Sequence, residues 1–242
     1  MPNMIRKTTK SPAVRSGPKG ARLVTPPGKK GLDRALVLHA ACDLCDEVGL
    51  AGLTIKALAE RLGIRPPSVY AHYDGLGDLR RDLALWGYAQ LADKLSRAVV
   101  GLSGARALVA AGGAYLGFIR QSPGLYAATV TTPAPTDAQL RDAADAGIEV
   151  LHRILASMDL SEHDQIHALR GLRSIVHGFG QLEANGAFQT KIDRNESFAR
   201  VLQTFVDAVQ AQGGKASGEA ASRPGKPRRA RSRADASNGR GK

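Results

Sequence analysis

Apolar residues recur at steps of three and four along most of the chain, from Leu32 to Gln212. This spacing places side chains on one face of an amphipathic helix. Sustained alternation of apolar and polar residues, which is typical of half-buried strands, is missing from the same range. The sequence therefore predicts an all-α fold. After the N-terminal region, one long helix is expected from Leu79 to Val99. Further helices are expected near 104–121, in a short stretch after Ser122, and near 137–157, 162–185 and 195–211.

Two adjacent prolines interrupt the pattern near the N-terminus, in the stretch LTIKALAERLGIRPPSVYAHY. Thr54 suits the N-cap of a helix that Gly63 ends, because glycine reaches left-handed dihedrals without a steric penalty. The first turn of a helix does not need the N–H that proline lacks, so Pro66 and Pro67 are expected to start the next helix. That helix should continue through Tyr73.

Two short helices joined by a glycine turn and supported by a longer first helix form a helix-turn-helix. In the second of them, Val69 is expected to face the core, while Ser68, Tyr70 and His72 can face outward. Outward residues of such a helix can reach base edges and phosphates in the major groove of DNA.

The segment LTIKALAERLGIRPPSVYAHYDGLGDLRRDL resembles the DNA-binding signature of the TetR family of bacterial transcriptional regulators, over about residues 32–85. The chain departs from that pattern at Arg65, where Ser or Thr is common, at Tyr73, where Phe is common, and at Leu76, where Lys is common. The resemblance implies that the last departure would remove one phosphate contact. The resemblance implies a DNA-binding surface made of Thr54, Lys56, Arg65, Pro66, Ser68, Tyr70, His72 and Tyr73.

The stretch LRGLRSIVHGFGQLEANGAFQTKIDRNESFARVLQTFVDAV resembles a TetR subgroup named for a Trp-His-Gly (WHG) signature, with Arg173 where Trp occurs in some members. The resemblance implies that the last two long helices pair with those of a second subunit and that earlier helices enclose a small-molecule pocket. The wide apolar faces of these two helices are in keeping with a dimer seam. Candidate pocket residues, each with a structural hydrogen bond as the alternative, are Tyr115, Arg120, Tyr126, His152, Arg173 and His177.

The net charge of +12 is concentrated at the two ends of the chain. Residues 1–31 hold eight Lys or Arg and no acidic residue, and residues 213–242 carry +7, which leaves −3 for the rest. Both ends are rich in Gly, Pro, Ser and Ala, so we expect them to be disordered. Residues 32–80 carry a net −2, so the N-terminal arm is expected to neutralise phosphates for them. The arm residues nearest the first helix are Arg22, Lys29 and Lys30.

Cys42 and Cys45 are the only cysteines, and their C-x-x-C spacing occurs in metal and redox sites. Both fall on the apolar stripe of the first helix, and no second Cys/His pair stands at a ligand spacing, which favours core packing. His163 and His167 could form one face of a metal site or simply lie at an exposed helix start. We assign no metal and no cofactor.

These features favour a homodimeric, ligand-responsive regulator, most simply a repressor, that binds a palindromic operator in double-stranded DNA. The alternative is an architectural protein that coats DNA through its basic tails. Motifs such as G-x-S-x-G, the P-loop and H-E-x-x-H are missing, so an enzyme is not expected. A polar N-terminus and the lack of an apolar run of about 18 residues predict a cytoplasmic protein without a membrane partner. The expected divisions are a basic arm (1–31), a helix-turn-helix domain (32–80), a ligand-binding and dimerisation domain (81–212) and a basic tail (213–242).

Overall fold

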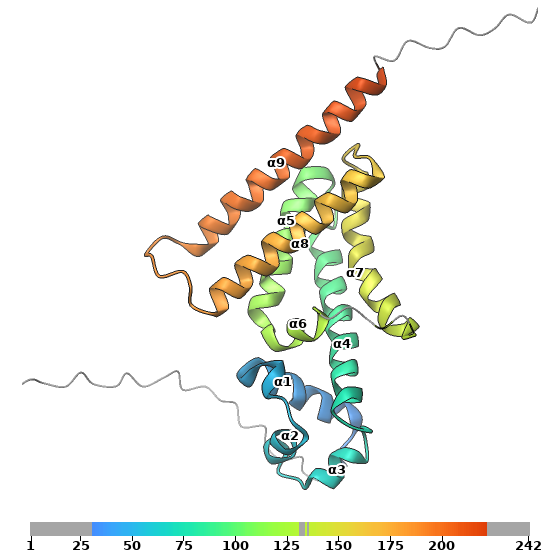
Figure 1. Cartoon of the computed structure of the whole chain (residues 1–242), viewed down its shortest axis with the longest axis vertical. Coiled ribbons are helices and arrows are strands. Elements are labelled where there is room, and N and C mark those ends of the chain that lie inside the picture. Colours follow the sequence, from blue (N-terminus) through green and yellow to red (C-terminus); the bar gives the residue numbers. More distant parts are fainter. Residues whose placement is uncertain (1–30, 131–133, 135, 222–242) are drawn as a thin grey trace, which may run out of the picture. The chain divides into compact units, whose positions relative to one another are not determined.

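The computed structural model describes residues 31–130, 134 and 136–221, with side-chain positions up to residue 213. All regular secondary structure in these residues is α-helical, which confirms the predicted fold class (Figure 1). The helices are α1 (Arg34–Gly52), α2 (Ile55–Leu62), α3 (Pro66–Tyr70), α4 (Leu76–Ala98), α5 (Gly104–Gln121), α6 (Pro123–Thr129), α7 (Ala138–Ala156), α8 (Glu162–Ala184) and α9 (Arg194–Ala221). None of them is long and apolar enough to span a membrane.

The turn between α2 and α3 forms as its residues predict. The Thr54 hydroxyl accepts a hydrogen bond from the Ala57 N–H at 3.1 Å, which caps α2. Gly63 ends α2 in the left-handed region, with φ of 66°. Pro66 and Pro67 then open α3 in its first turn. The helix-turn-helix is therefore built from local signals.

The structure corrects the predicted end of α3, because the helix stops at Tyr70 rather than Tyr73. The N–H groups of His72 and Tyr73 both donate to the Val69 carbonyl, at 3.0 and 3.1 Å, which closes the helix in a tight turn. This turn directs the Tyr73 side chain inward, where it is almost completely buried. Tyr73 is thus a core residue and not the exposed DNA contact that the resemblance implied.

Helix α4 connects the helix-turn-helix to the remaining helices. It contacts α1 and also packs against α5, α6 and α7. Leu79 and Leu83 near its start are fully buried, and Leu91 and Leu95 further along are buried as well. One helix therefore contributes to both cores.

A second connection joins α1 to α6. Gly124 lies so close to α1 that an added Cβ would lie 2.2 Å from the carbonyl carbon of Cys45. The Asp46 carboxylate accepts a hydrogen bond from the Gly124 N–H at 2.8 Å, in the first turn of α6 where that N–H has no partner within the helix. Burial raises the pKa of Asp46, opposed by the hydrogen bonds from Gly124 and Leu125. We call this contact the α1–α6 joint.

Helices α8 and α9 pack against each other and against α5 (Figure 1). Their inner faces bury Leu172 and Val176 of α8 and Leu202 and Val206 of α9. Helix α9 continues to Ala221, so the predicted disorder from residue 213 is wrong for the first part of that segment. The glycines at 213, 214 and 218 lower the helix propensity of this part, but α9 continues through them because elongation costs less than nucleation.

Candidate nucleic-acid interface and ligand cavity

Helix α3 presents its predicted DNA-binding residues to solvent. Arg65, Pro66 and Ser68 are exposed, and Tyr70 keeps 54% of its surface accessible. Val69 points the other way and is fully buried, so it fixes the orientation of the helix. These four side chains therefore form one polar and aromatic surface that is suited to a groove of DNA.

The remaining predicted contacts differ in how they are placed. Thr54 and Lys56 are exposed at the start of α2, although the Thr54 hydroxyl already caps the helix. His72 is half-buried in the turn after α3. The three arm residues, Arg22, Lys29 and Lys30, lie outside the described residues.

An arginine network that the sequence did not reveal fixes the turn after α3. Arg34 pairs with Asp82 at 2.9 Å and with Asp78 at 3.1 Å, and it donates to the His72 carbonyl at 2.6 Å. Its guanidinium carbon lies 4.1 Å from the centre of the Tyr73 ring, a cation–π contact. The hydrogen bond to Asp82 raises the pKa of Arg34. The network joins the start of α1, the α3–α4 turn and the first turns of α4.

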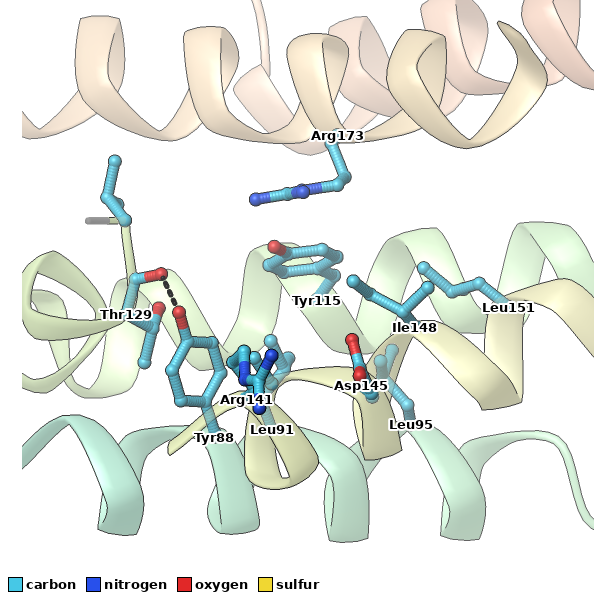
Figure 2. Close-up of a pocket in the computed structure, with 13 residues that line it drawn as sticks. Tyr88, Leu91, Leu95, Tyr115, Thr129, Arg141, Asp145, Ile148, Leu151 and Arg173 are labelled. Atoms are coloured by element: carbon cyan, nitrogen blue, oxygen red, sulfur yellow. Dashed lines mark hydrogen bonds between the residues drawn. The ribbon is translucent and has the colours of Figure 1, made fainter. Parts of the chain in front are cut away.

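Helices α4, α5, α6, α7 and α8 line a cavity of about 300 Å³, shown in Figure 2. Its floor and sides are aromatic and aliphatic, and three charged side chains reach it. The lining residues are Tyr88, Leu91, Leu95, Tyr115, Thr129, Val130, Arg141, Ala144, Asp145, Gly147, Ile148, Leu151 and Arg173. A volume at the lower end of the usual ligand-pocket range indicates a small ligand.

A neighbouring cavity of about 280 Å³ shares part of this wall. Common to both are Tyr115, Thr129, Val130 and Arg173, and the second adds Tyr126, Arg170, Ser174 and His177. The Tyr126 hydroxyl lies 2.8 Å from His177 Nδ1, a hydrogen bond that joins α6 to α8. The two cavities therefore meet at the α6 and α8 side of the first.

The polar side chains of the first cavity differ in whether they have a hydrogen-bond or ion-pair partner. The Tyr88 hydroxyl donates to the Thr129 carbonyl at 2.8 Å, as Figure 2 shows. Burial raises the pKa of Tyr115, and the nearby Arg173 opposes that shift, so the phenol stays protonated at neutral pH. Neither Arg141 nor Arg173 forms an ion pair with a carboxylate in the part of the chain that the structure describes.

The six candidate pocket residues separate into two groups. Tyr115, Tyr126, Arg173 and His177 line the cavities. Arg120 instead binds Glu183, with Nε 2.7 Å from Oε2, and donates to Asn195 at 2.8 Å, so it ties α5 to the α8–α9 region. His152 is half-buried on α7 and lines neither cavity.

Several cavity residues were missed from the sequence, among them Tyr88, Arg141 and Asp145. Tyr88 does not fall at the regular spacing of the apolar residues of α4, so the sequence does not mark it as a lining residue. Arg141 and Asp145 look like an ordinary exposed charge pair at i and i+4. Spacing alone gives no signal for their role, since it depends on α7 packing along α4.

Neither the two cysteines nor the His163–His167 pair is arranged as a metal site in the described residues. Burial raises the pKa of the Cys42 thiol to about 12 and of the Cys45 thiol to about 11, so both are protonated at neutral pH. His163 and His167 are exposed and stack edge to face, with ring centres 4.5 Å apart. No group of three or more candidate metal ligands occurs within the described ranges.

Comparison with known proteins identifies both parts of the chain. The family described as "Bacterial regulatory proteins, tetR family" matches residues 37–82, and "Tetracyclin repressor-like, C-terminal domain" matches residues 108–205. The uncharacterised HTH-type transcriptional regulator YobS of Bacillus subtilis is 32% identical over 180 residues, which cover 74% of this chain and 93% of that protein. The chain belongs to the TetR family. It is accordingly a helix-turn-helix, DNA-binding transcriptional regulator.

Two further relatives extend the TetR-family comparison. The uncharacterised HTH-type transcriptional regulator Rv0681 of Mycobacterium tuberculosis is 30% identical over 203 residues, covering 82% of this chain and 92% of that protein. A TetR variant from Acinetobacter baumannii AYE, solved in complex with minocycline, superimposes with a TM-score of 0.58 at 22% identity, covering 75% of this chain and 98% of that one. The TetR fold therefore extends over the helix-turn-helix and the larger helical region.

Proposed function

We propose that this TetR-family regulator is a homodimeric repressor that releases a palindromic operator when a small molecule fills the cavity. The observation that carries the proposal is that the cavity and the helix-turn-helix share structural elements. Tyr88, Leu91 and Leu95 of α4 line the cavity, while Asp78 and Asp82 of the same helix hold Arg34 at the start of α1. A ligand that moves α4 therefore acts on the DNA-binding unit.

Helix α6 provides a second route. Thr129 at its end lines the cavity, and Gly124 at its beginning is fixed to Asp46 of α1. Ligand and operator then favour different arrangements of α4 and α6, so each weakens binding of the other by the same factor. In support, the structurally similar TetR variant from Acinetobacter baumannii was solved with minocycline.

On the DNA side, α3 enters the major groove with Arg65, Ser68 and Tyr70 directed at bases and phosphates. The arm residues Arg22, Lys29 and Lys30 add phosphate contacts that compensate for the acidic helix-turn-helix. In a dimer, the two α3 helices lie about 34–36 Å apart, which matches one turn of DNA.

The dimer is formed by the outer faces of α8 and α9, consistent with the WHG-like pattern of this region. Large apolar side chains remain exposed there, among them Ile166, Leu182 and Val201, the last with 44% of its surface accessible. Val201→Glu should leave the subunit folded but place an unpaired charge in the seam, so the dimer dissociates. Light scattering measures this directly. Val100→Glu, the same change at a residue that is 78% exposed after α4, is the matched control.

The decisive experiment is a selection of bound DNA from random duplexes with the full chain. A regulator of this kind selects a palindrome and prefers it over random DNA by at least about a thousandfold. A protein that coats DNA through its tails selects no palindrome and shows little preference. Selection of a single unrepeated half-site would contradict the dimeric arrangement.

A further inference from the structure

We infer that the cavity takes a small organic acid, whose anionic group binds Arg173 and Arg141 while its apolar body lies against Tyr88, Tyr115 and the aliphatic wall. This inference rests on the proposed function, because it specifies the chemical class of the effector. Three observations support the inference: the charges that line the cavity, the lack of carboxylate partners for its arginines, and the shape of its wall.

The charge lining the two cavities is predominantly positive. Arg141 projects from α7 and Arg173 from α8, and Arg170 joins Arg173 at the second cavity. Asp145 is the one carboxylate among the residues that line either cavity. Three guanidinium groups against one carboxylate favour an anionic guest over a cationic one.

Pairing distinguishes Arg141 and Arg173 from Arg81 of α4 and Arg120 of α5. Arg81 binds Asp137 through two hydrogen bonds, the longer at 2.8 Å, and Arg120 binds Glu183 through two, at 2.7 and 3.0 Å. Within the described residues, Arg141 and Arg173 have no such carboxylate. The planar fork of a guanidinium matches a carboxylate in a bidentate arrangement, so the ligand can supply the missing group.

Shape and polarity define the rest of the guest. Figure 2 shows Arg173 above the Tyr115 ring, with Arg141, Tyr88, Leu91 and Leu95 on the opposite side and Ile148 and Leu151 at one end. An anionic head between Arg173 and Arg141 would leave the body among these rings and aliphatic side chains. Aromatic rings of this kind contribute large apolar contact area. The hydroxyl of Tyr88 already donates to the Thr129 carbonyl, so Tyr88 would contact the guest mainly through its ring.

The test uses three skeletons, naphthalene, biphenyl and decane, each as the carboxylate, the primary amide and the amine. Calorimetry with the full-length protein measures the affinity of each compound. For at least one skeleton the carboxylate should bind about tenfold or more tightly than its amide, because charge-assisted hydrogen bonds exceed neutral ones. The amine should bind most weakly. An amide or amine that equals its carboxylate in every series, or the failure of all nine compounds to bind, would overturn the inference.

Three variants locate the contact. Arg173→Gln and Arg141→Gln should each reduce carboxylate affinity by about tenfold, while amide affinity, which also reports that the cavity is folded, changes little. Asp145→Asn should strengthen carboxylate binding, because it removes a like charge. Arg106→Gln, on an exposed arginine of α5 that lines neither cavity, is the control and should have no effect. Equal loss in all arginine variants would mean nonspecific attraction and would overturn the assignment.

Operator binding, measured on the same preparations without any compound, separates this inference from the proposed function. A protein that binds its palindrome but shows no preference for the acids retains the regulator function and loses only the ligand class. A protein that binds no palindrome loses the regulator function, whatever the cavity binds.

Discussion

The helix-turn-helix and the cavity both carry arginines, but the two regions use them differently. In the helix-turn-helix, Arg61 binds Glu47 at 2.7 Å and Arg34 binds Asp82 and Asp78. In the cavity, Arg141 and Arg173 have no carboxylate partner among the described residues. The first pair of arginines holds helices together, and the second pair is the one that we propose for binding an anion. Because the helix-turn-helix is acidic overall and pairs two of its arginines, we expect phosphate attraction to come largely from the N-terminal arm.

The largest effect is expected at the joint that makes the two regions cooperate. In Gly124→Ala, the new methyl group would meet the backbone of Cys45, which has no flexible side-chain end to move aside. The free energy of unfolding should fall by about 3 kcal/mol, as for other overpacked sites. Denaturant unfolding measures the loss. Gly113→Ala, at a position in α5 with nothing within 4 Å, is the control and should be neutral or stabilising by up to about 1 kcal/mol. Equal unfolding midpoints would show that α1 and α6 separate easily.

Deleting residues 1–28 tests where the phosphate attraction originates. The deletion keeps Lys29 and Lys30 and removes the other six basic residues of the arm. The slope of log affinity against log salt should flatten by up to about 3 per subunit, or roughly a factor of 60 in affinity between about 50 and 200 mM salt. Titrations of operator and random duplexes at four salt concentrations provide the measurement. Preference between sequences should change less, because phosphate contacts position and base contacts specify. Parallel salt plots for both proteins would show that the helix-turn-helix binds without the arm.

Tyr70→Ala tests the exposed surface of α3. Since Tyr70 is 54% exposed, the variant should remain folded and lose about 1–3 kcal/mol of operator binding. Fluorescence anisotropy with the selected operator measures the loss, and circular dichroism checks the helix content. Tyr70→Phe keeps the ring and separates its contacts from those of the hydroxyl. Unchanged affinity in a folded Tyr70→Ala protein would place the groove contacts elsewhere.

Arg65 differs from Arg34 and Arg61, because it is exposed and has no ion pair in the described part of the chain. Arg65→Gln should therefore weaken binding to all duplexes about equally and reduce the salt slope by about 1. The same salt titrations detect this change, and Arg106→Gln is again the control. A change in sequence preference instead of slope would mean that Arg65 contacts a base.

The sequence predicted the parts of the fold that depend on neighbouring residues. The Thr54 cap, the Gly63 stop and the paired prolines each act within one helical turn, so their structure follows from local chemistry. The end of α3 was missed because it depends on Tyr73 packing beneath Arg34, which is 39 residues away. Tertiary packing there overrides the local helical pattern.

The cavity shows the same limit. Tyr115, Tyr126, Arg173 and His177 were found because they are polar residues in apolar stripes. Arg120 met the same criterion, but its partner Glu183 lies 63 residues away and holds it outside the cavity. Arg141 and Asp145 carry no signal in the sequence, since their role depends on how α7 lies against α4.

The hydrogen bond from Gly124 to Asp46 also makes one backbone amide a reporter of motion. Most amides in a helix exchange with solvent deuterium when their own helix frays, but the Gly124 proton is held by a carboxylate on α1. Its exchange rate therefore measures how often α1 and α6 part. Mass spectrometry of the α6 peptide with and without operator or effector can follow that opening in the unmodified protein.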